Sequence, residues 1–359
     1  MKKTILILTL VLCGAALAAP ASGRAAYDPI ASGQTKLRFD KSFLALLKRN
    51  GATLRAAAGA RLRAGSAIFP VSGGRFDPVS AKGFIEHDGA LLFKRGGHEL
   101  RLTSLQLKTT RRRAPYAAKL GGGQLKLAAA ATLVVNRRGF GERMTVSTLR
   151  LSAKVATRLE KKLRLPNVFQ AGQLLGDAVT TADPLTVSLR RAGEANLSLD
   201  PGFQAKLSAL FVAVNPIFPA EHPGPFTLPI FGGTLAPDAG TGKIELSGAL
   251  EFLQLGGGQV FWHDPSLDFA GHSLNAEAEV DPSPPYAGKL VALQIASTEG
   301  DSVSADPRAR EIAVSGPSLA LGSQMAAIFE DVFAKPQGRS GVFSAGEPVG
   351  RASFEAKGQ

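Results

Sequence analysis

Apolar and polar residues alternate along much of this chain, which is the pattern of strands with one buried face. The clearest stretches lie at 100–107, 125–127, 149–151 and 319–321, where leucines alternate with other residues, mostly at every second position. Glycine pairs and prolines separate these stretches at short intervals, as turns between strands do. The pattern predicts a chain built mainly from short β-strands.

Two segments depart from this alternation and show the spacing of an amphipathic helix. The first apolar face lies within 43–47, and Asp40 stands where an N-cap residue is expected. The second apolar face recurs within 155–163, at every fourth residue. We therefore expect two short helices between the strands of this part of the chain.

The chain also contains an internal repeat, because five sequence blocks occur twice in the same order. The blocks are 37–43 with 197–203, 69–74 with 228–233, 83–93 with 242–252, 115–120 with 285–290, and 168–172 with 342–346. The repeat predicts two copies of one domain, 34–193 and 194–359. Each copy is expected to be all-β, a β-sandwich or barrel-like domain carrying two short α-helices.

The first residues have the features of a secretory signal, which are a charged start and a following apolar run from 5 to 19. Cleavage is expected after Ala18 or Ala21, so 1–21 is read as a signal peptide. The single cysteine, Cys13, lies within this apolar run and is expected to be removed with it. We therefore expect a secreted or cell-envelope-associated protein without disulfides.

Charge differs sharply between the two copies. Residues 34–193 hold 30 Lys and Arg against 9 Asp and Glu, whereas residues 194–359 hold 9 against 19. The basic copy suits an anionic cell-wall polymer or a membrane surface, and it could also dock on its acidic twin. Divergence of solvated faces is the alternative. Nucleic acid is not an expected partner, because no recognition helix or aromatic stacking motif accompanies the basic residues.

Common catalytic motifs are missing from the sequence. It contains no G-x-S-x-G, no H-E-x-x-H and no C-x-x-C, so we expect a protein that is not an enzyme. The densest set of metal-ligand types, at 263–272, has no counterpart in the first copy and is interrupted by Pro265. Surface residues of a strand and turn are the favoured interpretation of that set, and no metal site is expected.

A pair of tyrosines occupies the same place in both copies. Tyr116 and Tyr286 each stand in a Pro-Tyr-Ala-x-Lys-Leu frame. A deprotonated phenol can ligate ferric haem, and a nearby lysine favours that form. The alternative is a packing residue whose hydroxyl binds a turn.

The two copies resemble the conserved repeat of HtaA-type proteins, which are exported haem-binding domains of the cell envelope. The resemblance rests on an opening amphipathic helix at 37–48, on the turn at 69–77, on the glycine-spaced strands of 83–93 and on Gly97-His98 before the alternating leucines. It implies the tandem all-β fold and haem capture.

The same resemblance implies where haem ligands would stand. In that family a tyrosine on the opening helix ligates the iron and a histidine lies close to it. His98 matches the histidine, whereas the tyrosine position falls at or near Leu46. In the second copy the corresponding places fall at about Lys206 and Gly258.

The sequence predicts an exported, non-enzymatic binding protein of two HtaA-like domains. Haem is its expected cofactor or cargo, with His98, Tyr116 and Tyr286 as candidate binding residues. The alternative function is a structural or adhesive envelope protein that holds anionic wall polymer without haem.

Overall fold

The computed structural model describes residues 27–109, 114–120, 123–130, 132–222, 224–281, 291–299 and 302–358. The expected signal peptide and Tyr286 lie outside these residues. Within the described part, no helix is both long and apolar enough to cross a membrane.

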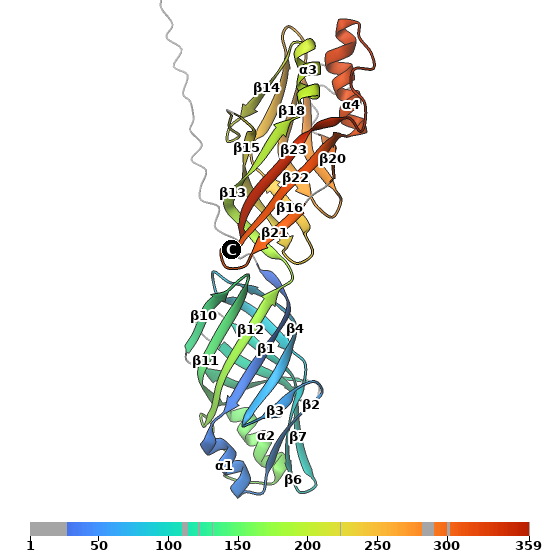
Figure 1. The fold of residues 1–359 in the computed structure, drawn as a ribbon. Helices are drawn as coiled ribbons and strands as arrows, with labels where there is room; N and C mark the ends of the chain where they lie inside the picture. The colour runs from blue at the N-terminus through green and yellow to red at the C-terminus, as the bar shows by residue number, and fades with distance from the viewer. Residues whose placement is uncertain are drawn as a thin grey trace, which may run out of the picture.

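The first domain is one antiparallel sheet with two helices at one end (Figure 1). Its elements are β1 (Asp28–Phe39), α1 (Lys41–Arg49), β2 (Thr53–Ala57), β3 (Arg61–Arg63), β4 (Ser66–Asp77), β5 (Lys82–His87), β6 (Ala90–Arg95), β7 (His98–Thr109), β8 (Ala114–Leu120), β9 (Gly123–Ala130), β10 (Thr132–Arg138), β11 (Gly141–Leu151), α2 (Ala153–Leu163) and β12 (Leu174–Pro184). The helix expected at 37–48 begins only at Lys41, since the alternating residues before Asp40 complete strand β1.

The first sheet closes on itself. Its strands follow the order β7-β5-β4-β1-β12-β11-β9-β8, and β8 pairs back with β7. The first half of β7 pairs with β6 and its second half with β5, so β6 and β2 extend beyond the closed ring. A ring of this size has an interior that side chains can fill.

The second domain repeats this arrangement. Its elements are β13 (Val187–Leu199), α3 (Pro201–Ala209), β14 (Val212–Ile217), β15 (Phe226–Ala236), β16 (Thr241–Leu246), β17 (Ala249–Gln254), β18 (Gln259–Asp268), β19 (Ser273–Asp281), β20 (Val291–Glu299), β21 (Ser302–Asp306), β22 (Glu311–Leu321), α4 (Ser323–Phe329), a π-helical turn (Glu330–Ala334), a 3₁₀ turn (Lys335–Gln337) and β23 (Pro348–Gly358). The order β18-β16-β15-β13-β23-β22-β20-β19 closes through β18 and β19. The predicted all-β class, with two short helices in each copy, is confirmed.

The two sheets meet between β12 and β13. The chain leaves the first sheet at Pro184 and enters the second at Val187, so the boundary expected between 193 and 194 lies inside β13. The domains stand end to end, and their helices lie at the two far ends of the molecule (Figure 1).

A buried polar cluster joins the domains at this boundary. Asp28 of the first domain accepts hydrogen bonds from the backbone N–H and the hydroxyl of Ser188, at 2.9 and 2.6 Å. Nearby, Glu142 binds Arg137 at 2.5 Å and also faces the charge of Arg310. Burial raises the pKa of Glu142 to about 7 in spite of these two guanidinium groups.

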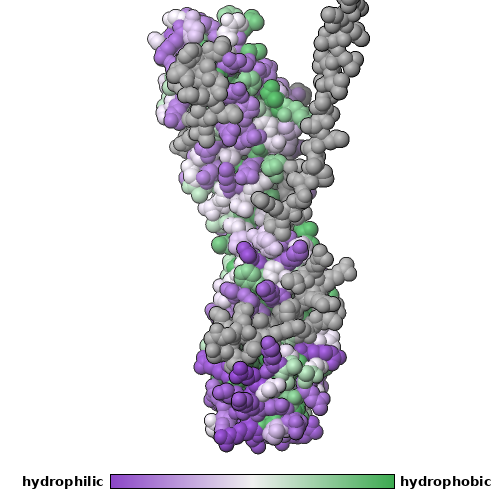
Figure 2. All heavy atoms as spheres, turned by 180° about the vertical axis from the view of Figure 1, so that it is seen from behind, coloured by the Kyte–Doolittle hydropathy of each residue, from purple (hydrophilic) through white to green (hydrophobic). Residues whose placement is uncertain are grey.

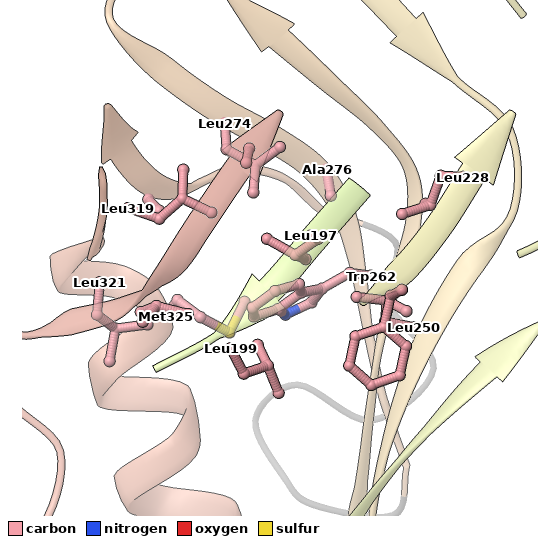
Figure 3. Packing of buried hydrophobic residues seen from close by; sticks show 14 of the residues in the cluster. Leu197, Leu199, Leu228, Leu250, Trp262, Leu274, Ala276, Leu319, Leu321 and Met325 are labelled. Atoms are coloured by element: carbon pink, nitrogen blue, oxygen red, sulfur yellow. The ribbon is translucent and has the colours of Figure 1, made fainter. Parts of the chain in front are cut away.

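Apolar side chains fill the two closed sheets separately. In the second domain, Trp262 lies among Leu197, Leu250 and Met325 (Figure 3). Its ring stacks on Phe329 with centroids 6.0 Å apart, so α4 is packed directly on the sheet. The first domain has its own core around Phe43 and the β-strand leucines. Each copy therefore buries the apolar face of its own strands.

Among the described residues, the first core contains a polar network whose counterparts in the second core are apolar. Thr35 donates its hydroxyl proton to His87 Nε2 at 2.6 Å, and His87 Nδ1 donates to the Leu105 carbonyl at 2.9 Å. Thr180 lies 2.6 Å from the Thr35 hydroxyl. This arrangement assigns the proton to Nδ1, because a carbonyl can only accept. The strand register matches Thr35, His87 and Thr180 with apolar residues of the second domain, namely Ala195, Leu246 and Phe354.

Burial lowers the pKa of His87 to about 4, whereas an unfolded histidine titrates near 6.5. Between these values the unfolded chain binds a proton that the folded chain excludes, so acidification destabilises the first domain. We predict that wild type loses roughly 2–3 kcal/mol of stability relative to His87→Leu between pH 7 and pH 4.

Urea unfolding at the two pH values measures this difference, and the titration of Glu142 cancels because both proteins carry it. A stability difference between the two proteins that stays constant with pH would contradict the buried, neutral imidazole.

Candidate functional site

Helix α1 begins because Asp40 caps it. The Asp40 carboxylate accepts hydrogen bonds from the hydroxyl of Ser42 and, at 2.8 Å, from its backbone N–H, and these bonds hold the pKa of the carboxyl below its usual range. Phe43 and Leu47 face the core and are buried. Leu46 is half-buried and packs against the same core. The helix therefore keeps the sheet end closed, and the expected tyrosine position is occupied by an aliphatic packing residue.

Helix α2 lies beside α1 at the same end of the domain (Figure 1). Ser152 caps it through a 3.3 Å hydrogen bond from the Val155 N–H, and Leu159 and Leu163 are fully buried. The one acidic residue of either helix, Glu160, accepts the backbone N–H of Phe169 at 3.1 Å. Its charge is therefore engaged by the loop that follows the helix.

Arg95, the last residue of β6, ties both helix C-termini to the sheet. Its Nε donates to the carbonyl of Asn50, the C-cap of α1, at 3.0 Å. Its Nη1 donates to the carbonyls of Leu163 and Arg164, at the end of α2, at 3.2 and 3.0 Å. A guanidinium group suits this place, because helix C-termini carry unpaired carbonyls and partial negative charge.

The second domain uses a neutral residue for the same task. Gln254 occupies the matching end of β17, and its amide nitrogen donates to the carbonyls of Leu210 and Phe333 at 3.0 and 2.9 Å. Leu210 is the C-cap of α3, and Phe333 lies in the turn that extends α4. The tie between helices and sheet is thus a shared feature of the two copies, whereas its charge is peculiar to the first.

His98 lies directly beside this tie. It is the first residue of β7 and pairs with Arg95 across the β6–β7 turn. Its side chain is half-buried, and it has no hydrogen-bond partner among the described residues. The structure therefore places His98 at the same end of the domain as the C-terminus of α1.

The equivalent place in the second domain is closed. Gly258 pairs with Gln254 and so takes the register position of His98. A Cβ atom on Gly258 would lie 2.6 Å from Cγ1 of Val332, which is too close for a real contact. A histidine therefore cannot stand there unless the side chain of Val332 moves.

The two helices at this end of the domain are rich in cations. Seven exposed basic side chains lie on α1 and α2, and none forms an ion pair with a described residue: Lys41, Lys48, Arg49, Lys154, Arg158, Lys161 and Lys162. We call this end, with His98 and these seven residues, the helical pole. Hydrophilic residues dominate the same end of the molecule in Figure 2. The corresponding end of the second domain is balanced, since Lys206 and Lys335 pair with Glu347 and Asp331.

Tyr116 does not approach His98. It stands on β8 and pairs with Leu107, near the far end of β7. Leu107 and His98 stand nine positions apart on β7, a distance of about 30 Å along an extended strand. One iron therefore cannot be held by both side chains. Tyr286, the repeat partner of Tyr116, lies outside the described residues.

The histidines of the second domain have other surroundings. His263 Nε2 lies 3.0 Å from the Glu279 carboxylate of the neighbouring strand. His222 stacks on Phe226, with ring centroids 4.9 Å apart, at a groove of about 540 Å³ beside α3. Among the described residues, no three metal-ligand side chains gather in one place.

The sequence did not predict the hydrogen bonds by which Arg95 and Gln254 hold the helix C-termini to the sheet. Arg95 and Gln254 stand at the same place in the repeat, two residues after the shared phenylalanine of the glycine-spaced strands. Their shared role could not be predicted from the sequence, because an arginine and a glutamine are different residue types and their common partners are backbone carbonyls. The carbonyls become visible only once the helices are placed.

No protein-family model matches the chain, and no curated protein matches it. The solved N-terminal domain of HtaA from Corynebacterium glutamicum is 16% identical over 48% of this chain and 99% of that domain, with a TM-score of 0.37. The C-terminal domain of the same protein is 11% identical over 44% of this chain and 98% of that domain, with a TM-score of 0.36.

Arg95→Ala removes all three hydrogen bonds of the first tie and leaves helix-end carbonyls without a partner. We predict a loss of about 2–4 kcal/mol in the stability of the first domain. Arg95→Gln should recover part of this loss, because Gln254 performs the same task in the second domain. Urea unfolding measures both changes.

The matched control is Arg101→Ala, which removes an exposed arginine from the same hairpin and should change stability by less than about 0.5 kcal/mol. Equal effects of Arg95→Ala and Arg101→Ala would refute the tie.

Proposed function

We propose that this chain is a non-enzymatic binding protein that acts outside the cytoplasm and that its first domain holds haem at the helical pole. The observation that carries the proposal is the contrast between His98 and Gly258. One register position holds a half-buried histidine without a partner in the first domain and is closed by Val332 in the second. A neutral imidazole nitrogen is a common axial ligand of haem iron.

The charges of the helical pole support the same ligand. Haem carries two propionate groups, and lysine and arginine side chains bind carboxylates by charge-assisted hydrogen bonds. The seven basic residues of α1 and α2 are exposed and have no ionic partner among the described residues. Leu46, at the place where the HtaA-type resemblance implies a tyrosine, offers a packing surface and no ligand. His98 would therefore be the sole protein ligand from the described residues of the pole.

The secretory features of 1–21 support an extracytoplasmic site of action. A haem carrier needs no catalytic set, which agrees with the motifs missing from the sequence. The second domain, with its closed position and balanced charges, would act as a partner of the first and would not bind haem itself.

A second candidate function is the binding of an anionic wall polymer by the same seven cations. The observation that favours it is their arrangement over two helices, which is broader than two propionates require. Such binding would weaken with salt and would not depend on His98.

A hemin titration of the full mature chain, followed at the Soret band, tests the first candidate. We predict saturable one-to-one binding that weakens at least about tenfold in His98→Ala, since an axial ligand contributes more than about 1.4 kcal/mol. His272→Ala is the matched control, because His272 is an exposed histidine of the second domain and should leave the affinity unchanged.

Saturable binding that His98→Ala does not weaken would contradict the role of His98. A chain that shows no Soret shift but sediments with anionic polymer in low salt would favour the second candidate.

A further inference from the structure

A second basic site lies at the opposite end of the first domain, on the outer face of the closed sheet. It is an open groove of about 520 Å³ near the junction with the second domain. Arg75, Lys82 and Lys108 supply three cations to its lining, and Tyr27 and Phe84 supply two aromatic rings. Among the described residues, no acidic side chain lines it.

Strand pairing brings these side chains together. Arg75 of β4 stands opposite Phe84 of β5, and Phe84 stands opposite Lys108 of β7. Residues that pair directly across antiparallel strands share one face of the sheet. Tyr27 precedes β1 by one residue and reaches the same row, because Pro29 pairs with Arg75. The row is therefore held by the backbone of four strands.

The two rings hold the guanidinium of Arg75. Its central carbon lies 5.4 Å from the ring centroid of Tyr27 and 5.5 Å from that of Phe84. These distances are within the range of cation–π contacts, which restrict the plane of the guanidinium while its N–H groups remain free at the edge. Arg75 has no ionic partner among the described residues, and the same is true of Lys82 and Lys108.

The second domain provides an internal comparison. By strand register, the five groove residues match Thr186, Thr234, Thr241, Lys243 and Asp268. There the aromatic rings are absent, and Lys243 stands opposite Asp268. The shared fold therefore does not require the rings or the three cations of the first domain.

We propose that this groove binds a phosphate group that carries more than one negative charge, either a phosphate monoester or the terminal unit of a phosphate-rich chain. A guanidinium fork fixed between two rings matches the oxygen geometry of phosphate, and the two lysines add point charges on the same face. Three unpaired cations around one groove suit a group that carries more than one negative charge. A phosphate monoester carries such a charge at neutral pH, whereas a single carboxylate does not.

The groove is independent of the proposed haem site. Lys108 and His98 stand ten residues apart on β7, which is about 33 Å along an extended strand. A phosphate in the groove cannot therefore contact the helical pole. Loss of binding at one site should therefore not change binding at the other.

Calorimetric titration of the full mature chain with inorganic tripolyphosphate at low salt tests the proposal. Arg75→Gln should weaken binding about tenfold or more, because it removes the oriented fork. Phe84→Leu should weaken it several-fold without any change in charge, because it removes one of the two rings. Arg143→Gln is the matched control, since it removes an exposed arginine from the same domain outside the groove, and it should change the affinity less than about twofold. Citrate should bind at least about tenfold more weakly than tripolyphosphate.

Three results would each overturn the proposal. They are the absence of saturable binding, equal losses in Arg75→Gln and Arg143→Gln, and equal affinity for citrate and tripolyphosphate. His98→Ala should bind tripolyphosphate like the wild type, so this titration remains decisive whether or not the chain binds haem.

Discussion

Each domain depends on one strand pairing that closes its sheet, β7 with β8 in the first domain and β18 with β19 in the second. After closure, each strand of the ring has a paired neighbour on both sides, and the apolar faces of the strands point into one interior. Leucine, valine and phenylalanine side chains fill these interiors. A cavity of only about 20 Å³ lies beside Trp262 in the second. A ligand of the size of haem does not fit in this cavity.

That constraint explains why the two copies share a frame but differ in chemistry. Gln254 and Arg95 hold the helix ends in the same way, so the frame tolerates a neutral or a charged residue at this place. The two domains differ at three matching places. The first domain has the buried His87 network where the second has apolar residues. It also has His98 where the second has a glycine, and Arg75 between two aromatic rings where the second has a threonine. The first copy therefore carries the groups that suit anionic ligands, and the second keeps a fold with closed or balanced positions.

Local patterns in the sequence predict what depends on neighbouring residues. The alternating leucines of β7 and the capped face of α1 form as expected, because each depends on a short stretch of chain. The ring closure depends on pairing between strands, so the sequence could not tell that Tyr116 of β8 pairs near the end of β7 that is far from His98. The sequence also could not show that β13 starts at Val187, seven residues before the expected repeat boundary, because this too depends on strand pairing. Similar blocks mark where the copies correspond, and they do not mark where a strand changes sheet.

The central claim is that ligand binding belongs to the helical pole of the first domain and that the equivalent end of the second is closed. Hydrogen–deuterium exchange of the full chain, with and without hemin, tests it most directly. The account predicts slower exchange in peptides that cover α1, the β6–β7 turn and α2, with no change in α3 or the β17–β18 turn. Protection of the second domain, or the same exchange throughout the chain with and without hemin, would contradict it.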